Sequence, residues 1–170
     1  LSLLLGSIIG LVQYKIKRLL AYSTISHIGL ILLALGNESI NGLESTIFYI
    51  LQYSITSLNT FFVLILLGYT LNKNNVISSY SPIQSISQLS GLFYSNPALS
   101  IAFALSLFSM SGIPPLIGFF GKYFVINSAL MSGNYFLSIV VILTSVISAV
   151  YYLLIIKTLF LPSTNDTIST

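Results

Sequence analysis

Long apolar runs separated by short polar stretches dominate this sequence. A helix that crosses a membrane needs about 20 predominantly apolar residues. We expect membrane-spanning helices at residues 19–35, 44–70 and 135–160, each of which approaches or exceeds that length. The run at residues 1–12 is shorter and ends before a basic cluster, and we expect it to be the truncated end of a helix in a longer chain.

The apolar run at residues 97–131 is longer than one straight span requires. It contains the sequence SGIPP at residues 111–115, where two prolines remove backbone donors and clash with the preceding turn. This pattern predicts a helix that breaks there. Residues 71–96 are rich in Ser, Asn and Gln and predict a loop with a short surface helix at Ile83–Leu92, while residues 161–170 form a polar tail.

The distribution of charge indicates whether residues 97–131 cross the membrane once or twice. Loops on the cytoplasmic or matrix side are enriched in Lys and Arg. With one crossing, the basic residues fall on one side and the acids Glu38 and Glu44 on the other; these basic residues are Lys15, Lys17, Arg18, Lys73 and Lys157. With two crossings, Lys157 would join the acids. We therefore predict an all-α, polytopic transmembrane bundle of five membrane elements, with the basic loops on the matrix or cytoplasmic side.

The predicted break, with Gly112, Pro114 and Pro115 as its hinge, is a candidate functional feature. Lipid cannot satisfy the backbone groups that a broken helix frees, so breaks are tolerated where protein or a hydrated cavity covers them. Broken helices mark the binding sites of many transporters. A simple proline kink is the alternative, and an ionisable residue close by favours transport.

That ionisable residue is Lys122, seven residues after Pro115 and therefore roughly 10 Å farther along a helix. A lysine at the bilayer centre costs several kcal/mol unless it faces a cavity or a partner. A buried lysine that gains and loses a proton would suit a proton relay. Alternatively, its long side chain snorkels to the membrane interface. The position in the sequence leaves both interpretations open.

A second candidate is His27, near the middle of the run at residues 19–35. Histidine changes charge close to neutral pH, which makes it a natural proton shuttle. The alternative is a structural histidine whose ring is hydrogen-bonded between helices. Its position is compatible with either role.

The run at residues 44–70 carries a group of polar side chains at near-helical spacing. Its members are Gln52, Tyr53, Thr56, Ser57 and Asn59. Hydroxyl and amide groups can order water into a wire, but they also join membrane helices by hydrogen bonds. We favour the second interpretation.

Composition narrows the possible chemistry. Of 170 residues, 55% are hydrophobic and 5% charged, whereas soluble domains carry about 25% charged residues. The sequence lacks Cys and has one His and three acids, too few for a disulfide framework, an iron–sulfur cluster or a metal site. The net charge of +3 comes from scattered residues at the ends of apolar runs, which indicates membrane topology rather than nucleic-acid binding. We expect no cofactor in this chain.

Two motifs resemble a known family. Residues 15–29, KIKRLLAYSTISHIG, and residues 111–122, SGIPPLIGFFGK, are similar to matching segments of the antiporter-like membrane subunits of respiratory complex I, NADH–ubiquinone oxidoreductase. The form of the second motif looks most like the chain 2 type. The resemblance covers nearly the whole chain and implies an antiporter-like five-helix repeat with one discontinuous helix, here the second, C-terminal repeat of a larger subunit.

The resemblance also implies a function. Such a subunit translocates protons across the mitochondrial inner membrane, while flavin, iron–sulfur clusters and ubiquinone reside in other subunits of the complex. Its expected partners are other membrane-arm subunits and inner-membrane lipids, and it would be a non-redox part of a translocase. Lys122 matches the broken-helix lysine of the half-channel to the intermembrane space, and His27 a position on the central hydrophilic axis. The Ile, Asn, Tyr and Ser richness predicts an AT-rich mitochondrial genome, of fungal origin.

One departure from the family pattern concerns the helix at residues 44–70. Related chains carry His and Lys there, whereas this sequence has Tyr49, Tyr53 and Ser57, which hold no charge. Two alternatives to the complex I function stay open. The chain could belong to a cation/proton antiporter of the same fold, or it could be a structural membrane scaffold that transports nothing.

Overall fold

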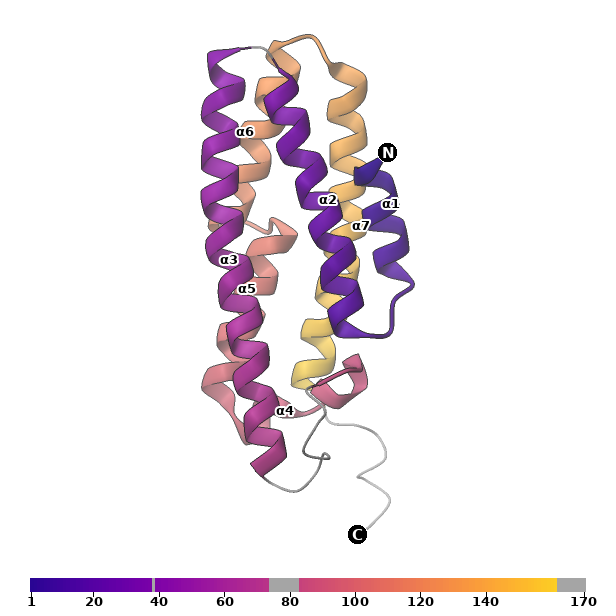
Figure 1. The fold of residues 1–170 in the computed structure, drawn as a ribbon, viewed down its shortest axis with the longest axis vertical. Coiled ribbons are helices and arrows are strands. Elements are labelled where there is room, and N and C mark those ends of the chain that lie inside the picture. The colour runs from indigo at the N-terminus through magenta and orange to yellow at the C-terminus, as the bar shows by residue number, and fades with distance from the viewer. Residues whose placement is uncertain (38, 74–82, 162–170) are drawn as a thin grey trace.

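The computed structural model describes residues 1–37, 39–73 and 83–161, and this part of the chain is helical without strands. The long helices run along a common axis as an elongated bundle (Figure 1). The elements in order are α1 (Ser2–Leu11), α2 (Ile16–Gly36), α3 (Ile40–Lys73), the 3₁₀ helix η1 (Ile86–Leu89), α4 (Leu92–Ser95), α5 (Pro97–Ser111), α6 (Ile117–Met131) and α7 (Tyr135–Phe160). The predicted all-α class is confirmed.

Within the described residues, three helices are long and apolar enough to cross a membrane. They are α2, α7 and the Ile40–Tyr69 part of α3, with 21, 26 and 30 residues. The outer face of α3 carries large apolar side chains that are mostly exposed in the isolated chain. Examples are Leu51, Ile55, Leu58 and Phe62, which are 61%, 69%, 71% and 63% exposed. An aqueous surface would not tolerate so continuous an apolar face.

Hydrogen bonds define the two ends of the bundle. At one end, the amide of Ile16 donates to the carbonyl of Gln84, and the amide of Gly91 donates to the carbonyl of Thr158. The start of α2, the segment around η1 and the end of α7 are therefore neighbours. This brings Lys157 to the same end as the basic cluster at the start of α2. At the other end, Asn37 bonds to Ser128 of α6 and to Asn134, the residue before α7.

The discontinuous helix, α5 followed by α6, runs antiparallel to α3 along most of its length. In α6, the Ser128 hydroxyl lies 3.4 Å from that of Ser45. In α5, Met110 lies near Thr60, with its sulfur 3.9 Å from the hydroxyl oxygen. The chain thus goes from α5 into α6 without turning back, and Figure 1 shows the two halves stacked end to end beside α3. This is the single broken crossing that the charges predicted.

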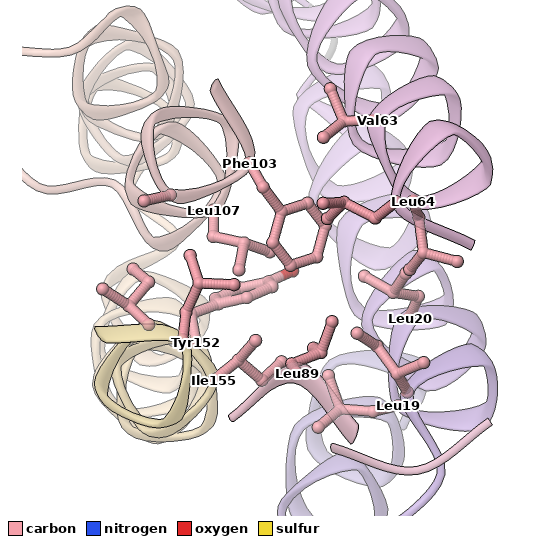
Figure 2. Close-up of a cluster of buried hydrophobic side chains, with 14 of the residues drawn as sticks. Leu19, Leu20, Val63, Leu64, Leu89, Phe103, Leu107, Tyr152 and Ile155 are labelled. Carbon is pink, nitrogen blue, oxygen red and sulfur yellow. The ribbon is translucent and has the colours of Figure 1, made fainter. Parts of the chain in front are cut away.

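A cluster of buried apolar side chains fills the basic half of the bundle (Figure 2). Leu19 comes from α2, Leu64 from α3, Phe103 from α5 and Tyr152 from α7, and all are at most 2% exposed. Because lipid tails are as apolar as leucine, close packing rather than transfer out of water holds such helices together. The cluster fixes α5 against three other helices and so anchors one side of the break.

One predicted element is wrong. The expected surface helix at Ile83–Leu92 is replaced by η1 and the beginning of α4. Its apolar residues do not face solvent, since Ile83 and Leu89 are 0% exposed and belong to the apolar cluster. They close the basic end of the core, and that burial outweighs the polar composition around them. Glu38, residues 74–82 of the predicted loop and residues 162–170 of the predicted tail lie outside the described residues.

Candidate functional site

Lys122 lies in the second turn of α6 and is 7% exposed. Its Nζ donates a hydrogen bond to the carbonyl oxygen of Ser111 at 2.8 Å. Ser111 is the last residue of α5, where carbonyls have no partner within the helix and carry partial negative charge. The amine is therefore held at the C-terminal end of a half-helix inside the bundle. The side chain is therefore directed into the break and not toward the surface of the bundle.

The conformation of Gly112 makes room for this lysine. Its φ of +83° is a left-handed conformation that ends α5, and a Cβ there would lie 2.8 Å from Cδ of Lys122. Glycine satisfies both demands, because it lacks a Cβ and adopts positive φ without strain. Pro114 and Pro115 lie in the non-helical connection between α5 and α6, and both are exposed at the surface of the chain. All three predicted hinge residues thus lie at the break, and Gly112 touches the lysine.

A second glycine lets the two half-helices meet. A Cβ on Gly118, at the start of α6, would overlap the backbone carbonyl of Ser109 near the end of α5. The start of α6 is thus pressed directly against the backbone of α5. This contact and the lysine bond together fix the geometry of the break.

His27 lies inside the bundle at 5% exposure, and tyrosines surround it. Its Nδ1 is 2.7 Å from the hydroxyl of Tyr49 in α3, and its Nε2 is 3.1 Å from the hydroxyl of Tyr152 in α7. The imidazole stacks on Tyr53, with ring centroids 4.7 Å apart and an interplanar angle of 26°. The histidine thus links α2, α3 and α7, as expected of a histidine with a structural role. Its two partners are hydroxyl groups, which can also pass protons.

Tyr49 connects the surroundings of His27 with those of Lys122. A Cβ on Gly121, the residue before the lysine, would lie 3.1 Å from Cδ2 of Tyr49 and 3.2 Å from the side-chain oxygen of Gln52. The absence of a side chain at Gly121 therefore lets α6 approach α3 at the level of both polar groups. The structure brings the two predicted relay residues to the same layer of the bundle.

The predicted polar group on α3 is only partly gathered on the inner face. Gln52 is buried at 8%, and Tyr53 donates from its hydroxyl to Thr24 Oγ1 at 3.0 Å. Asn59 is exposed on the outer face of α3. Its neighbour Thr60 is the polar residue that faces inward, with 0% of its surface exposed. Successive helical residues point roughly 100° apart, so including Asn59 in the stripe was wrong by one position.

The remaining hydroxyls of this group bond to their own helix. Thr56 Oγ1 donates to the carbonyl of Gln52 at 3.0 Å, and Ser57 Oγ donates to that of Ser54 at 3.1 Å. Thr60 Oγ1 likewise donates to the carbonyl of Thr56 at 2.7 Å. These residues satisfy their hydroxyls locally and form no side-chain wire.

The sequence matches a known family along most of its length. The family described as NADH:quinone oxidoreductase/Mrp antiporter, TM, matches residues 1–148. This chain belongs to that family. A relative from Rhizopus oryzae, called NADH-ubiquinone oxidoreductase chain 2, is 57% identical over 157 residues, which cover 92% of this chain and 30% of the relative. The chain spans about a third of the length of the curated relatives that it matches.

Two solved structures extend the comparison. Respiratory complex I from Thermus thermophilus contains a chain with 34% identity and a TM-score of 0.76, covering 94% of this chain and 34% of that one. The Mrp complex from Dietzia sp. contains one with 30% identity and a TM-score of 0.79, covering 95% of this chain and 28% of that one. The fold of this chain is therefore shared by a chain of respiratory complex I and by a chain of an Mrp complex.

A half-open groove of about 360 Å³ lies between α3 and α6 at the end of the bundle that carries Glu44, the acidic end. Glu44 lines it, together with Asn41, Ser45, Phe48, Phe124, Asn127 and Ser128. The groove lies beyond Lys122 along α6, on the side away from the basic loops. No group of three or more His, Cys, Asp or Glu residues could hold a metal ion in the described part of the chain.

Sequence reasoning missed three parts of the site. The acceptor for Lys122 is a backbone carbonyl, which no residue pattern reveals. Tyr152 was not singled out, although a Tyr-Tyr pair inside the apolar run at residues 135–160 was a usable signal. Tyr49 was noted as a departure from the family pattern but was not assigned to the site.

Proposed function

We propose that this chain is part of a core membrane-arm subunit of respiratory complex I that translocates protons across the mitochondrial inner membrane. The observation that carries the proposal is the buried amine of Lys122, bonded to the open C-terminal end of half-helix α5. The relative from Rhizopus oryzae, which is named as chain 2 of NADH-ubiquinone oxidoreductase, supports the choice of complex.

The proposed role of Lys122 follows from its surroundings. Its protonated amine is stabilised by the Ser111 carbonyl and by the negative end of the α5 dipole. A small change in the angle between α5 and α6 would move that carbonyl and favour release of the proton. The groove lined by Glu44 lies on the acidic side of the lysine and would receive the proton. Lys122 is the proposed terminal donor, and His27 the proposed shuttle that supplies it from the matrix side.

The chain carries no electrons in this proposal. Flavin, iron–sulfur clusters and ubiquinone are assigned to other subunits of the complex, with which this chain would assemble in the inner membrane as a multi-pass, non-redox part of the translocase. Quinone reduction elsewhere would drive the movement of the break. Membrane-arm subunits and lipids are the proposed partners along the exposed apolar faces.

A subunit of a cation/proton antiporter is the second candidate. The similarity to a chain of the Mrp complex, at 30% identity and a TM-score of 0.79, favours it. A buried lysine at a broken helix would serve proton exchange as well as redox-driven pumping. The two functions differ in their driving force, since an antiporter moves protons against a second cation and without NADH oxidation. A scaffold without transport is the third candidate.

The test replaces Lys122 with Met in the native complex and measures NADH–quinone reductase activity and proton pumping in sealed vesicles. We expect both to fall while the complex assembles normally. Lys157→Met is the matched control, because Lys157 is exposed at the basic end of α7. Unchanged pumping in Lys122→Met would support the scaffold. Transport that needs Na⁺ but not NADH would support the antiporter.

A further inference from the structure

His27 has a tyrosine hydroxyl at each of its two ring nitrogens. Tyr49 in α3 lies 2.7 Å from Nδ1, and Tyr152 in α7 lies 3.1 Å from Nε2. Both tyrosines are almost fully buried, at 1% and 0% exposure. The three side chains therefore form a hydrogen-bonded row, hereafter the triad, that crosses the interior of the bundle from α3 through α2 to α7.

The two hydrogen bonds of this row can point in either of two directions, and both nitrogens are hydrogen-bonded in each case. A neutral imidazole donates from one nitrogen and accepts at the other, while a phenolic hydroxyl can do either. Tyr49 can donate to Nδ1 while Nε2 donates to Tyr152, or every bond can point the other way. Both arrangements satisfy both nitrogens. A backbone carbonyl in place of either hydroxyl would accept only, and would fix the tautomer.

We propose that Tyr49, His27 and Tyr152 form a proton relay that conducts across the bundle between α3 and α7. This inference rests on the proposed function and adds two tyrosines to it. Tyr152 receives a proton on its oxygen as its own hydroxyl proton passes to Nε2 of His27. The proton on Nδ1 passes to the oxygen of Tyr49, which releases its hydroxyl proton. One proton enters, one leaves, and no redox partner is required.

The surroundings suit such a shift. Donor and acceptor atoms at 2.7 and 3.1 Å are within the range for direct proton transfer. Between transfers, the stack on Tyr53 holds the imidazole in this plane. Rotation of the hydroxyls and a turn of the imidazole about its Cβ–Cγ bond restore the starting arrangement. Because the protons move together, neither phenol has to become a phenolate in an apolar interior, where a bare charge is expensive.

The triad also connects with the lysine site. The ring of Tyr49 faces the gap left by Gly121, the residue before Lys122. The output end of the triad therefore lies at the level of the proposed terminal donor, and the input end lies on α7. Two tyrosines occupy this route in a chain whose α3 helix has no His or Lys from Ile40 to Leu71.

The adjacent Tyr151 provides a matched control. It is 2% exposed, its ring centroid lies 4.6 Å from that of Tyr152, and its hydroxyl oxygen has no hydrogen-bond partner among the described residues. Tyr151→Phe removes a buried hydroxyl from the same helix without touching His27. Removing a hydroxyl that makes no bond is expected to leave stability unchanged or slightly higher.

The experiment compares Tyr152→Phe, Tyr49→Phe and Tyr151→Phe in the intact complex. Proton pumping, coupled quinone reductase activity and the solvent deuterium isotope effect are measured. We expect both triad variants to slow pumping by about tenfold or more, since positioned proton-transfer groups contribute about 10²–10⁴-fold to rates. Their isotope effect should differ from that of wild type, a change that a purely structural tyrosine would not cause. Tyr151→Phe should match wild type.

Pumping by Tyr152→Phe and Tyr49→Phe equal to that of Tyr151→Phe would overturn the relay. If one triad variant fails to assemble, the other decides, because the loss of either hydroxyl interrupts the row. Lys122→Met separates the two proposals. A loss of pumping in Lys122→Met with normal pumping in both triad variants would reject the relay and keep the proposed function, whereas normal pumping in Lys122→Met would reject the function itself.

Discussion

The amine of Lys122 donates a hydrogen bond to the backbone carbonyl of Ser111, eleven residues earlier in the chain, at 2.8 Å. In a helix that carbonyl would accept from the amide four residues later, but here that residue is Pro115, which has no amide hydrogen. The titratable side chain of Lys122 therefore supplies a donor that the backbone lacks. Any event that changes the angle between α5 and α6 acts on this bond, and the same bond holds the two half-helices in register.

The crowding of Gly112 against Lys122 predicts that Gly112→Ala will impair both folding and transport. A left-handed residue with a side chain costs about 1–2 kcal/mol, and the new methyl group would also displace the lysine stem. Gly133→Ala is the control, since Gly133 has a φ of +77° with nothing within 4 Å of its Cβ position. The midpoint temperature of thermal inactivation of the purified complex should fall for both variants, and proton pumping should fall only for Gly112→Ala. Equal pumping in both variants would contradict this.

The contact between the half-helices makes Gly118 sensitive to any side chain. Gly118→Ala would force α6 away from the Ser109 carbonyl, and we expect a lower midpoint of thermal inactivation together with slower pumping. Gly36→Ala meets nothing within 4 Å and should raise stability slightly, by less than the roughly 0.5–1 kcal/mol of a mid-helix glycine, because Gly36 is the last residue of α2. The inactivation midpoints of the two variants should therefore move in opposite directions.

Asn37 joins three helices at the acidic end. Its Nδ2 donates to the hydroxyl of Ser128 at 3.2 Å, and its Oδ1 accepts from Asn134 at 3.0 Å. We expect Asn37→Ala to cost about 1–3 kcal/mol, because it leaves partly buried polar groups without partners. The checking measurement is the thermal midpoint of the complex. A midpoint within error of wild type would show that water replaces the amide.

The two faces of α3 predict different tolerance of apolar substitution. Gln52 is buried against Gly121, so Gln52→Leu removes a polar group from the level of Lys122 and should slow proton pumping several-fold. Asn59 is exposed on the outer face, and Asn59→Leu should pump like wild type. Vesicle acidification rates at matched complex content compare the two variants. Slower proton pumping by Asn59→Leu than by wild type would indicate that a partner subunit contacts the outer face of α3.

Much of the architecture could be read from local pattern. Apolar runs of sufficient length had to become helices, since lipid leaves no other way to satisfy the backbone. The prolines after Gly112 located the break, and the one-sided distribution of basic residues chose a single crossing over two. The short segment at Ile83–Leu92 was misread because its local composition is polar, while its few apolar residues fill the end of a core formed by distant helices.

The sequence by itself determined the helices, the break, the family and the presence of one lysine in an apolar run, because these depend on residue type and spacing along one chain. Tertiary structure alone decided what that lysine touches and which polar residues face inward. The carbonyl of Ser111 is a backbone group, and Tyr49 and Tyr152 reach His27 from helices 22 and 125 residues away. Such partners are set by how helices cross and rotate against one another, which no local pattern encodes.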